Sequence, residues 1–132
     1  MFTRVSHIGV VVRDIDEALN VYTNILGFSP PTHRMDVPEL GFRNAMLHLG
    51  DVGIELMETT DPNNEFGRFL ERHGEGLYHI CLVVDDIDAQ IKSLRAKGAD
   101  VLEVPPSESI GLKRGFVRRR SARGVLIEMV QA

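Results

Sequence analysis

The stretch His7-Ile-Gly-Val-Val-Val-Arg-Asp-Ile-Asp-Glu-Ala-Leu at residues 7–19 recurs at residues 79–91 as His79-Ile-Cys-Leu-Val-Val-Asp-Asp-Ile-Asp-Ala-Gln-Ile. The correspondence continues downstream in the same order. Leu26-Gly27-Phe28 matches Lys97-Gly98-Ala99, and Gly53-Ile54-Glu55-Leu56-Met57 matches Leu126-Ile127-Glu128-Met129-Val130. Because order and spacing are both kept, we interpret the chain as a tandem repeat of one supersecondary unit.

Each half is predicted to form a strand, a helix and then three strands. In the first half a β-rich segment at 5–12 precedes Asp14, a typical helix N-cap with Glu17 three residues on, and Gly27 is placed to end the helix. Asp86 and Gly98 take the same places in the second half. The further strands are expected near 28–36, 42–49 and 52–58, then near 100–104, 113–118 and 124–130, with a short amphipathic helix at 65–72 between the halves.

These elements predict an α+β fold made of two tandem βαβββ repeats, about residues 1–60 and about 76–132, within a single domain spanning 1–132. One such unit is too small to bury both faces of its sheet alone. We therefore expect the two sheets to pair around a shared metal-binding cleft. The partner half could come from the same chain or from a dimer mate.

Composition indicates an ordinary globular protein. The chain has 132 residues, of which 43% are hydrophobic and 26% charged, and its formal net charge is −4, which argues against a nucleic-acid binder. No apolar run approaches the roughly 20 residues that a membrane crossing needs. The N-terminus shows no signal-peptide arrangement and Cys81 is the only cysteine, so a cytoplasmic location is expected.

Two histidines and two glutamates are the candidate metal ligands. His7 and His79 begin the repeated strands, while Glu55 and Glu128 lie between apolar neighbours at matching positions of later strands. A carboxylate in a buried strand is costly unless it is paired or bound to metal. A hydrogen-bonded structural histidine is the alternative interpretation at each single position. The four together predict a divalent metal ion such as Co, Zn, Ni, Mn or Fe.

Several motifs resemble the vicinal oxygen chelate superfamily, which includes glyoxalase I, extradiol dioxygenases and bleomycin-resistance proteins. The similarity is greatest to its methylmalonyl-CoA epimerase family and covers nearly the whole chain. The stretches that carry it are His7-Ile-Gly-Val-Val-Val with residues 18–28, Gly53-Ile-Glu-Leu-Met-Glu, Phe66-Gly-Arg-Phe-Leu-Glu-Arg-His-Gly-Glu-Gly and Ser121-Ala-Arg-Gly-Val-Leu-Ile-Glu.

This resemblance implies a glyoxalase-like fold and a metal-dependent epimerase of methylmalonyl-CoA or a related 2-substituted acyl-CoA, acting through a metal-stabilised enolate. By the same resemblance Glu128 is a catalytic acid or base as well as a ligand. Some members of the family place a second glutamate where this chain has Asn44, which cannot act as a base. The expected partners are a small-molecule substrate, most simply an acyl-CoA, and a second copy of the chain in a homodimer.

Other departures concern the presumed acyl site. Ile110-Gly111 replaces the family's His-Gly, and Phe116-Val117-Arg118-Arg119 replaces its Phe-Leu-His-Pro. A glyoxalase I-like lactoylglutathione lyase is the nearest alternative, although the segment 66–76 argues against it. An extradiol dioxygenase would use two histidines and one carboxylate on iron. A resistance protein that sequesters a small molecule is an alternative of another class, and it would need no set of metal ligands.

Overall fold

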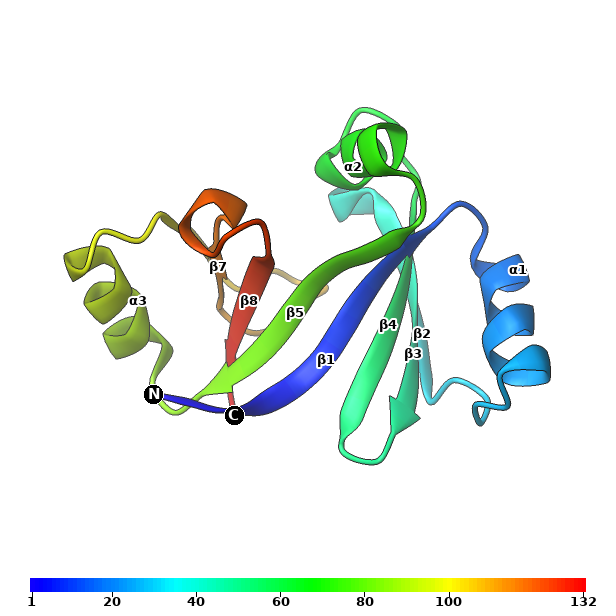
Figure 1. Cartoon of the computed structure of the whole chain (residues 1–132), viewed down its shortest axis with the longest axis horizontal. Helices are drawn as coiled ribbons and strands as arrows, with labels where there is room; N and C mark the ends of the chain where they lie inside the picture. The colour runs from blue at the N-terminus through cyan, green and yellow to red at the C-terminus, as the bar shows by residue number, and fades with distance from the viewer. The chain divides into compact units, whose positions relative to one another are not determined.

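A computed structural model describes all 132 residues, which form mainly β-strands with few helices (Figure 1). The α+β class predicted from the sequence is confirmed. In chain order the elements are β1 (Phe2–Val12), α1 (Ile15–Asn20), the π-helical turn η1 (Val21–Ile25), β2 (His33–Val37), the 3-10 turn η2 (Pro38–Leu40), β3 (Phe42–Leu49), β4 (Val52–Thr59), α2 (Glu65–His73), β5 (Gly76–Val84), α3 (Ile87–Ala96), β6 (Val101–Val104), β7 (Arg114–Val117), the 3-10 turn η3 (Arg119–Ser121) and β8 (Leu126–Gln131).

Two compact units divide the chain, one comprising residues 7–78 and the other residues 1–6 with 79–132. In the first of these, the strand order is β2-β3-β4-β1, with β1 parallel to β4 and the other pairs antiparallel. Helix α1 packs against β4. Its apolar core is made by Val12, Ile15, Leu19, Ala45, Leu47 and Leu56.

The second unit repeats this layout. Its strand order is β5-β8-β7-β6, with β5 parallel to β8 and the other pairs antiparallel. Helix α3 contacts β6, β7 and β8. The start of β1 also belongs here, since the hydroxyl of Thr3 donates to the carbonyl of Val83 at 3.2 Å. The core residues are Val84, Ile87, Ile91, Val101, Val117 and Met129.

Aspartate caps begin the main helix of both units, as predicted. The Asp14 carboxylate accepts from the backbone N–H groups of Asp16 and Glu17 at 3.0 and 3.1 Å, and Asp86 accepts from Ala89 at 3.0 Å. Each cap satisfies donors that a helix N-terminus leaves without intrahelical partners. The cap therefore sets the point at which the chain turns from strand to helix.

One predicted strand is shorter than expected. The segment expected at 28–36 is extended only from His33, where β2 begins, and it ends at Val37. Pro30 and Pro31 precede it, and proline has no N–H to donate to a sheet ladder. The prediction of a strand at residues 28–32 is therefore wrong.

Helix α2 lies between the repeats and closely approaches the preceding turn. Asn64 caps it by accepting from the N–H of Gly67 at 2.9 Å. A Cβ atom at Gly67 would lie 2.3 Å from the carbonyl oxygen of Pro62, so only glycine fits there. The helix packs the Phe66 ring between Phe42 and Tyr78, with centroid separations of 5.2 and 5.1 Å.

None of the helices combines the length and apolar character that a bilayer crossing would require.

Candidate metal centre

The first His–Glu pair lies in the unit 7–78, on the parallel strands β1 and β4. His7 is in register with Gly53, and Gly9 with Glu55, so the two side chains are diagonal neighbours. His7 Nε2 lies 3.3 Å from Glu55 Oε1, and the side chains are only 13% and 12% exposed. The sheet therefore brings together two residues that are far apart in the sequence.

Gly53 makes room for this histidine. A Cβ atom at Gly53 would lie 3.1 Å from the Cβ of His7 and 2.7 Å from the sulfur of Met46. A larger residue would push the imidazole or the Met46 side chain from its place. The glycine thus permits the approach of His7 to the strand that carries Glu55.

The second pair lies in the other unit, on the parallel strands β5 and β8. Cys81 is in register with Glu128 just as Gly9 is with Glu55. His79 Nε2 lies 3.1 Å from Glu128 Oε1, and the side chains are 5% and 8% exposed. Each unit therefore builds a buried His–Glu pair of the same design, from the residues that the repeat singled out.

A third residue faces the outer oxygen of each glutamate. Asn44 Nδ2 donates to Glu55 Oε2 at 2.7 Å. Arg114 Nη1 lies 3.7 Å from Glu128 Oε2. The two are equivalent by register, since Asn44 opposes Met57 and Arg114 opposes Val130, each two residues after its glutamate.

The sequence did not predict the contacts of Asn44 and Arg114, because these contacts depend on cross-strand register and not on a sequence motif. The stretch 113–118 does not align with 42–49 by residue identity. Only the pairing of β3 with β4, and of β7 with β8, identifies Asn44 and Arg114 as equivalents.

The donor chemistry fits a divalent metal ion. Glu55 and Glu128 are buried carboxylates, with residue exposures of 9% and 6%, and each faces an imidazole nitrogen through Oε1. Imidazole and carboxylate are ligands of first-row divalent ions, and burial of a carboxylate is favourable only when it is paired or coordinates a metal. The residues present in each unit thus supply one imidazole and one carboxylate donor.

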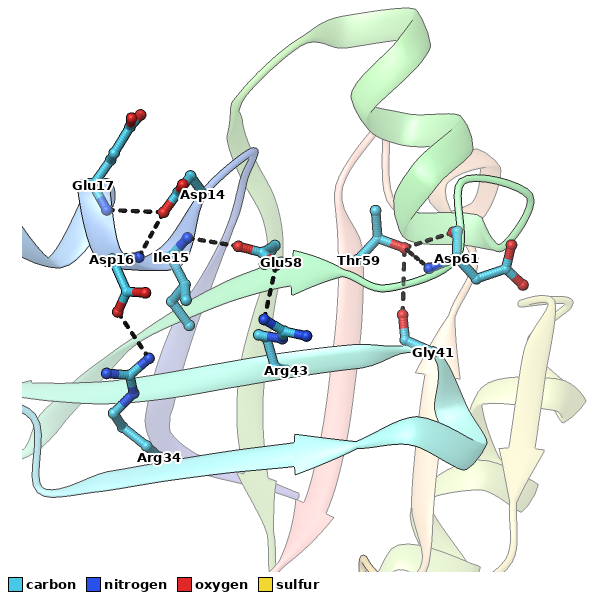
Figure 2. A network of polar contacts seen from close by, with 10 residues as sticks. All are labelled: Asp14, Ile15, Asp16, Glu17, Arg34, Gly41, Arg43, Glu58, Thr59 and Asp61. Carbon is cyan, nitrogen blue, oxygen red and sulfur yellow. Dashed lines mark hydrogen bonds and ion pairs between the residues drawn. The ribbon is translucent and has the colours of Figure 1, made fainter.

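Other carboxylates do not compete for this role. Glu58 accepts from the N–H of Ile15 at 2.8 Å and pairs with Arg43 at 3.5 Å, so it is committed to the start of α1 (Figure 2). Two further glutamates, Glu39 and Glu108, are exposed. Cys81 is fully buried, in line with a structural thiol.

The basic segment 113–123 is partly neutralised. Arg118 Nε lies 3.3 Å and Arg120 Nη2 2.6 Å from the same carboxylate oxygen of Asp100. Lys113 pairs with Asp88 and, at 3.4 Å, with Glu103. Both sets of contacts show that these cations are paired with carboxylates.

Comparison with known proteins gives consistent matches. Residues 6–116 match the family described as Glyoxalase/Bleomycin resistance protein/Dioxygenase superfamily. The chain is 30% identical over 134 residues to the ethylmalonyl-CoA/methylmalonyl-CoA epimerase of Cereibacter sphaeroides, covering 99% of both chains. It is also 30% identical over 131 residues to the mitochondrial methylmalonyl-CoA epimerase of Homo sapiens, covering 98% of this chain and 74% of the relative.

A solved structure shares the fold as well. A variant of Streptomyces coelicolor methylmalonyl-CoA epimerase in complex with 2-nitronate-propionyl-CoA superposes with a TM-score of 0.90 at 31% identity. The match covers 100% of this chain and 99% of that chain. The glyoxalase-like fold expected from the sequence is therefore confirmed.

Proposed function

Because the chain belongs to the glyoxalase/bleomycin resistance protein/dioxygenase superfamily, we propose that it is a metal-dependent epimerase of methylmalonyl-CoA or a related 2-substituted acyl-CoA. The observation that carries the proposal is the repeated, buried His–Glu pair, one in each unit. Epimerase relatives that match over nearly the whole chain support the substrate class. Fold alone would not select the reaction, since function belongs to the site.

We assign one divalent ion to His7, Glu55, His79 and Glu128. The repeat makes the two pairs equivalent, and two imidazoles with two carboxylates suit Co, Zn, Ni, Mn or Fe. When bound, the ion supplies a Lewis acid that stabilises negative charge on substrate oxygens. Asn44 then holds the outer oxygen of Glu55 in place through its hydrogen bond, while Arg114 lies beside the outer oxygen of Glu128 as a cation.

Glu128 is the residue to which we assign proton transfer at the carbon between thioester and carboxylate. Its side chain is buried and its two oxygens have different neighbours, His79 and Arg114. A proton carrier must reach its proton within hydrogen-bond distance, and a buried carboxylate held on both sides is oriented for that task. Asn44 has no ionisable group, so it cannot serve as the opposite partner.

The test is proton exchange in deuterated water. Metal-loaded protein is incubated with one epimer of methylmalonyl-CoA, and the α-proton signal and the epimer ratio are followed by NMR. Loss of the α-proton signal together with racemisation is the expected result. Absence of exchange combined with turnover of the methylglyoxal–glutathione adduct would instead establish a lactoylglutathione lyase. Tight binding of either compound without any turnover would indicate a sequestering protein.

A further inference from the structure

Arg114 is a large, charged residue at a position where the other unit has a small, neutral one. The repeat offers an internal comparison, because the equivalent residue in the other unit is Asn44. A neutral amide holds Glu55 there with one hydrogen bond of 2.7 Å. The guanidinium approaches Glu128 only to 3.7 Å, which is longer than a hydrogen bond. Orientation of the glutamate alone therefore does not explain an arginine.

The guanidinium of Arg114 has N–H donors that meet no acceptor in the structure. The side chain is 15% exposed, and its central carbon lies 5.7 Å from the centre of the Phe116 ring. Its Nε is buried and has no hydrogen-bond partner. A buried donor without an acceptor is costly, so an acceptor delivered by a ligand would be bound with a gain.

The contact with Glu128 also leaves the other edge of the guanidinium without a hydrogen-bond acceptor in the structure. Arginine offers two flat edges, and Nη1, the nitrogen that faces Glu128, does not belong to the edge formed by Nε and Nη2. That remaining edge carries two parallel N–H groups. Such an edge matches the two oxygens of a carboxylate, which is why arginine recognises carboxylates better than lysine does.

We propose that Arg114 is a specificity-determining residue that binds the carboxylate of a 2-carboxyacyl thioester through its Nε and Nη2 edge. This inference rests on the proposed function and adds to it the group that selects the substrate. Glu128 and Phe116 hold the guanidinium in place from one edge and one face. A thioester without a carboxylate would gain nothing from Arg114.

The test compares two ligands on matched variants. Binding of methylmalonyl-CoA and of propionyl-CoA, which lacks the carboxylate, is measured by calorimetry on metal-loaded protein. In Arg114→Gln the affinity for methylmalonyl-CoA is expected to fall about 10–100-fold while that for propionyl-CoA stays unchanged, because a charge-assisted bidentate contact is lost. Arg114→Lys should fall between, since it keeps the charge and loses the fork.

Lys113→Gln is the matched control, because it removes a positive charge from the adjacent position, where Lys113 pairs with Asp88 and Glu103. It should leave both affinities unchanged. Equal weakening of both ligands in Arg114→Gln, loss of bound metal in that variant, or an unchanged preference would overturn the inference. Failure of the unsubstituted protein to exchange the α-proton would overturn the proposed function first. The two failures are thus distinguishable.

Discussion

At the scale of single residues, the two glutamates of the candidate metal centre each have a polar neighbour at both oxygens. Glu55 meets His7 through Oε1 and Asn44 through Oε2. A carboxylate can only accept, so the amide must turn Nδ2 toward Glu55 and Oδ1 away from it. That Oδ1 is buried without a hydrogen-bond partner. We therefore expect Asn44 to orient Glu55 rather than to transfer a proton.

Removal of this amide should loosen the ligand beside it. Asn44→Ala is expected to weaken metal binding about 10–100-fold, the usual effect of deleting a hydrogen bond to a ligand side chain. Calorimetric titration with Co or Zn measures the change. Asn63→Ala, at an exposed asparagine of the turn before α2, is the control. Equal metal affinity in the two variants would show that Asn44 does not position Glu55.

At the scale of elements, the last strand of each repeat is tied to the start of that repeat's helix. Glu58 Oε1 accepts from the N–H of Ile15 at 2.8 Å, and Gln131 Oε1 accepts from the N–H of Ile87 at 2.9 Å. The contact thus recurs with a carboxylate in one unit and an amide in the other. A side-chain oxygen is the shared requirement, and it supplies an acceptor that the helix N-terminus needs.

This equivalence predicts the outcome of substitutions at Glu58. Glu58→Gln should leave the free energy of unfolding almost unchanged, because the amide oxygen keeps the contact and the part-exposed pair with Arg43 contributes little. Glu58→Ala should cost about 1 kcal/mol. Urea denaturation measures both.

The same pair of variants separates a structural from a chemical role. Glu58→Gln should exchange the α-proton of methylmalonyl-CoA at the rate of the unsubstituted protein. Gln131→Ala serves as the control for stability and should lose a similar amount to Glu58→Ala. A collapse of exchange in Glu58→Gln would make Glu58 the missing acid or base instead.

At the scale of the whole molecule, each unit has its own apolar core and its own half of the proposed ligand set. Metal binding would therefore depend on both units at once. A ligand that binds only the folded chain stabilises it by mass action. Metal should accordingly raise the thermal midpoint of the complete protein.

Metal excess at 100 times its Kd is expected to add about 2.7 kcal/mol to the free energy of unfolding, and a chelator should remove that gain. Calorimetric melting with and without metal measures it. Glu55→Ala and His79→Ala take one ligand from each unit, and each should abolish stoichiometric binding and the metal-dependent shift. Full metal occupancy in either variant would mean that the four-ligand set is wrong.

Much of the fold follows from local chemistry that a sequence displays directly. The aspartate caps at residues 14 and 86 and the repeated His–Glu pairs were predicted, and the structure has all of them. The strand predicted at 28–36 begins only at His33, because Pro30 and Pro31 have no N–H to donate to the sheet. Asn44 was noted only as a missing base, and the contact of Arg114 with Glu128 was not foreseen.

The sequence by itself thus determined the repeat, the α+β class and the identity of the four candidate ligands, because each depends on residue type and on spacing along one segment. Only the tertiary structure decided which side chains complete each glutamate's environment. Asn44 and Arg114 reach Glu55 and Glu128 through antiparallel pairing with a neighbouring strand, and that register is set by packing across the sheet. For this reason, the contact that leads us to propose Arg114 as the substrate-selecting residue could be identified only from the pairing of the strands.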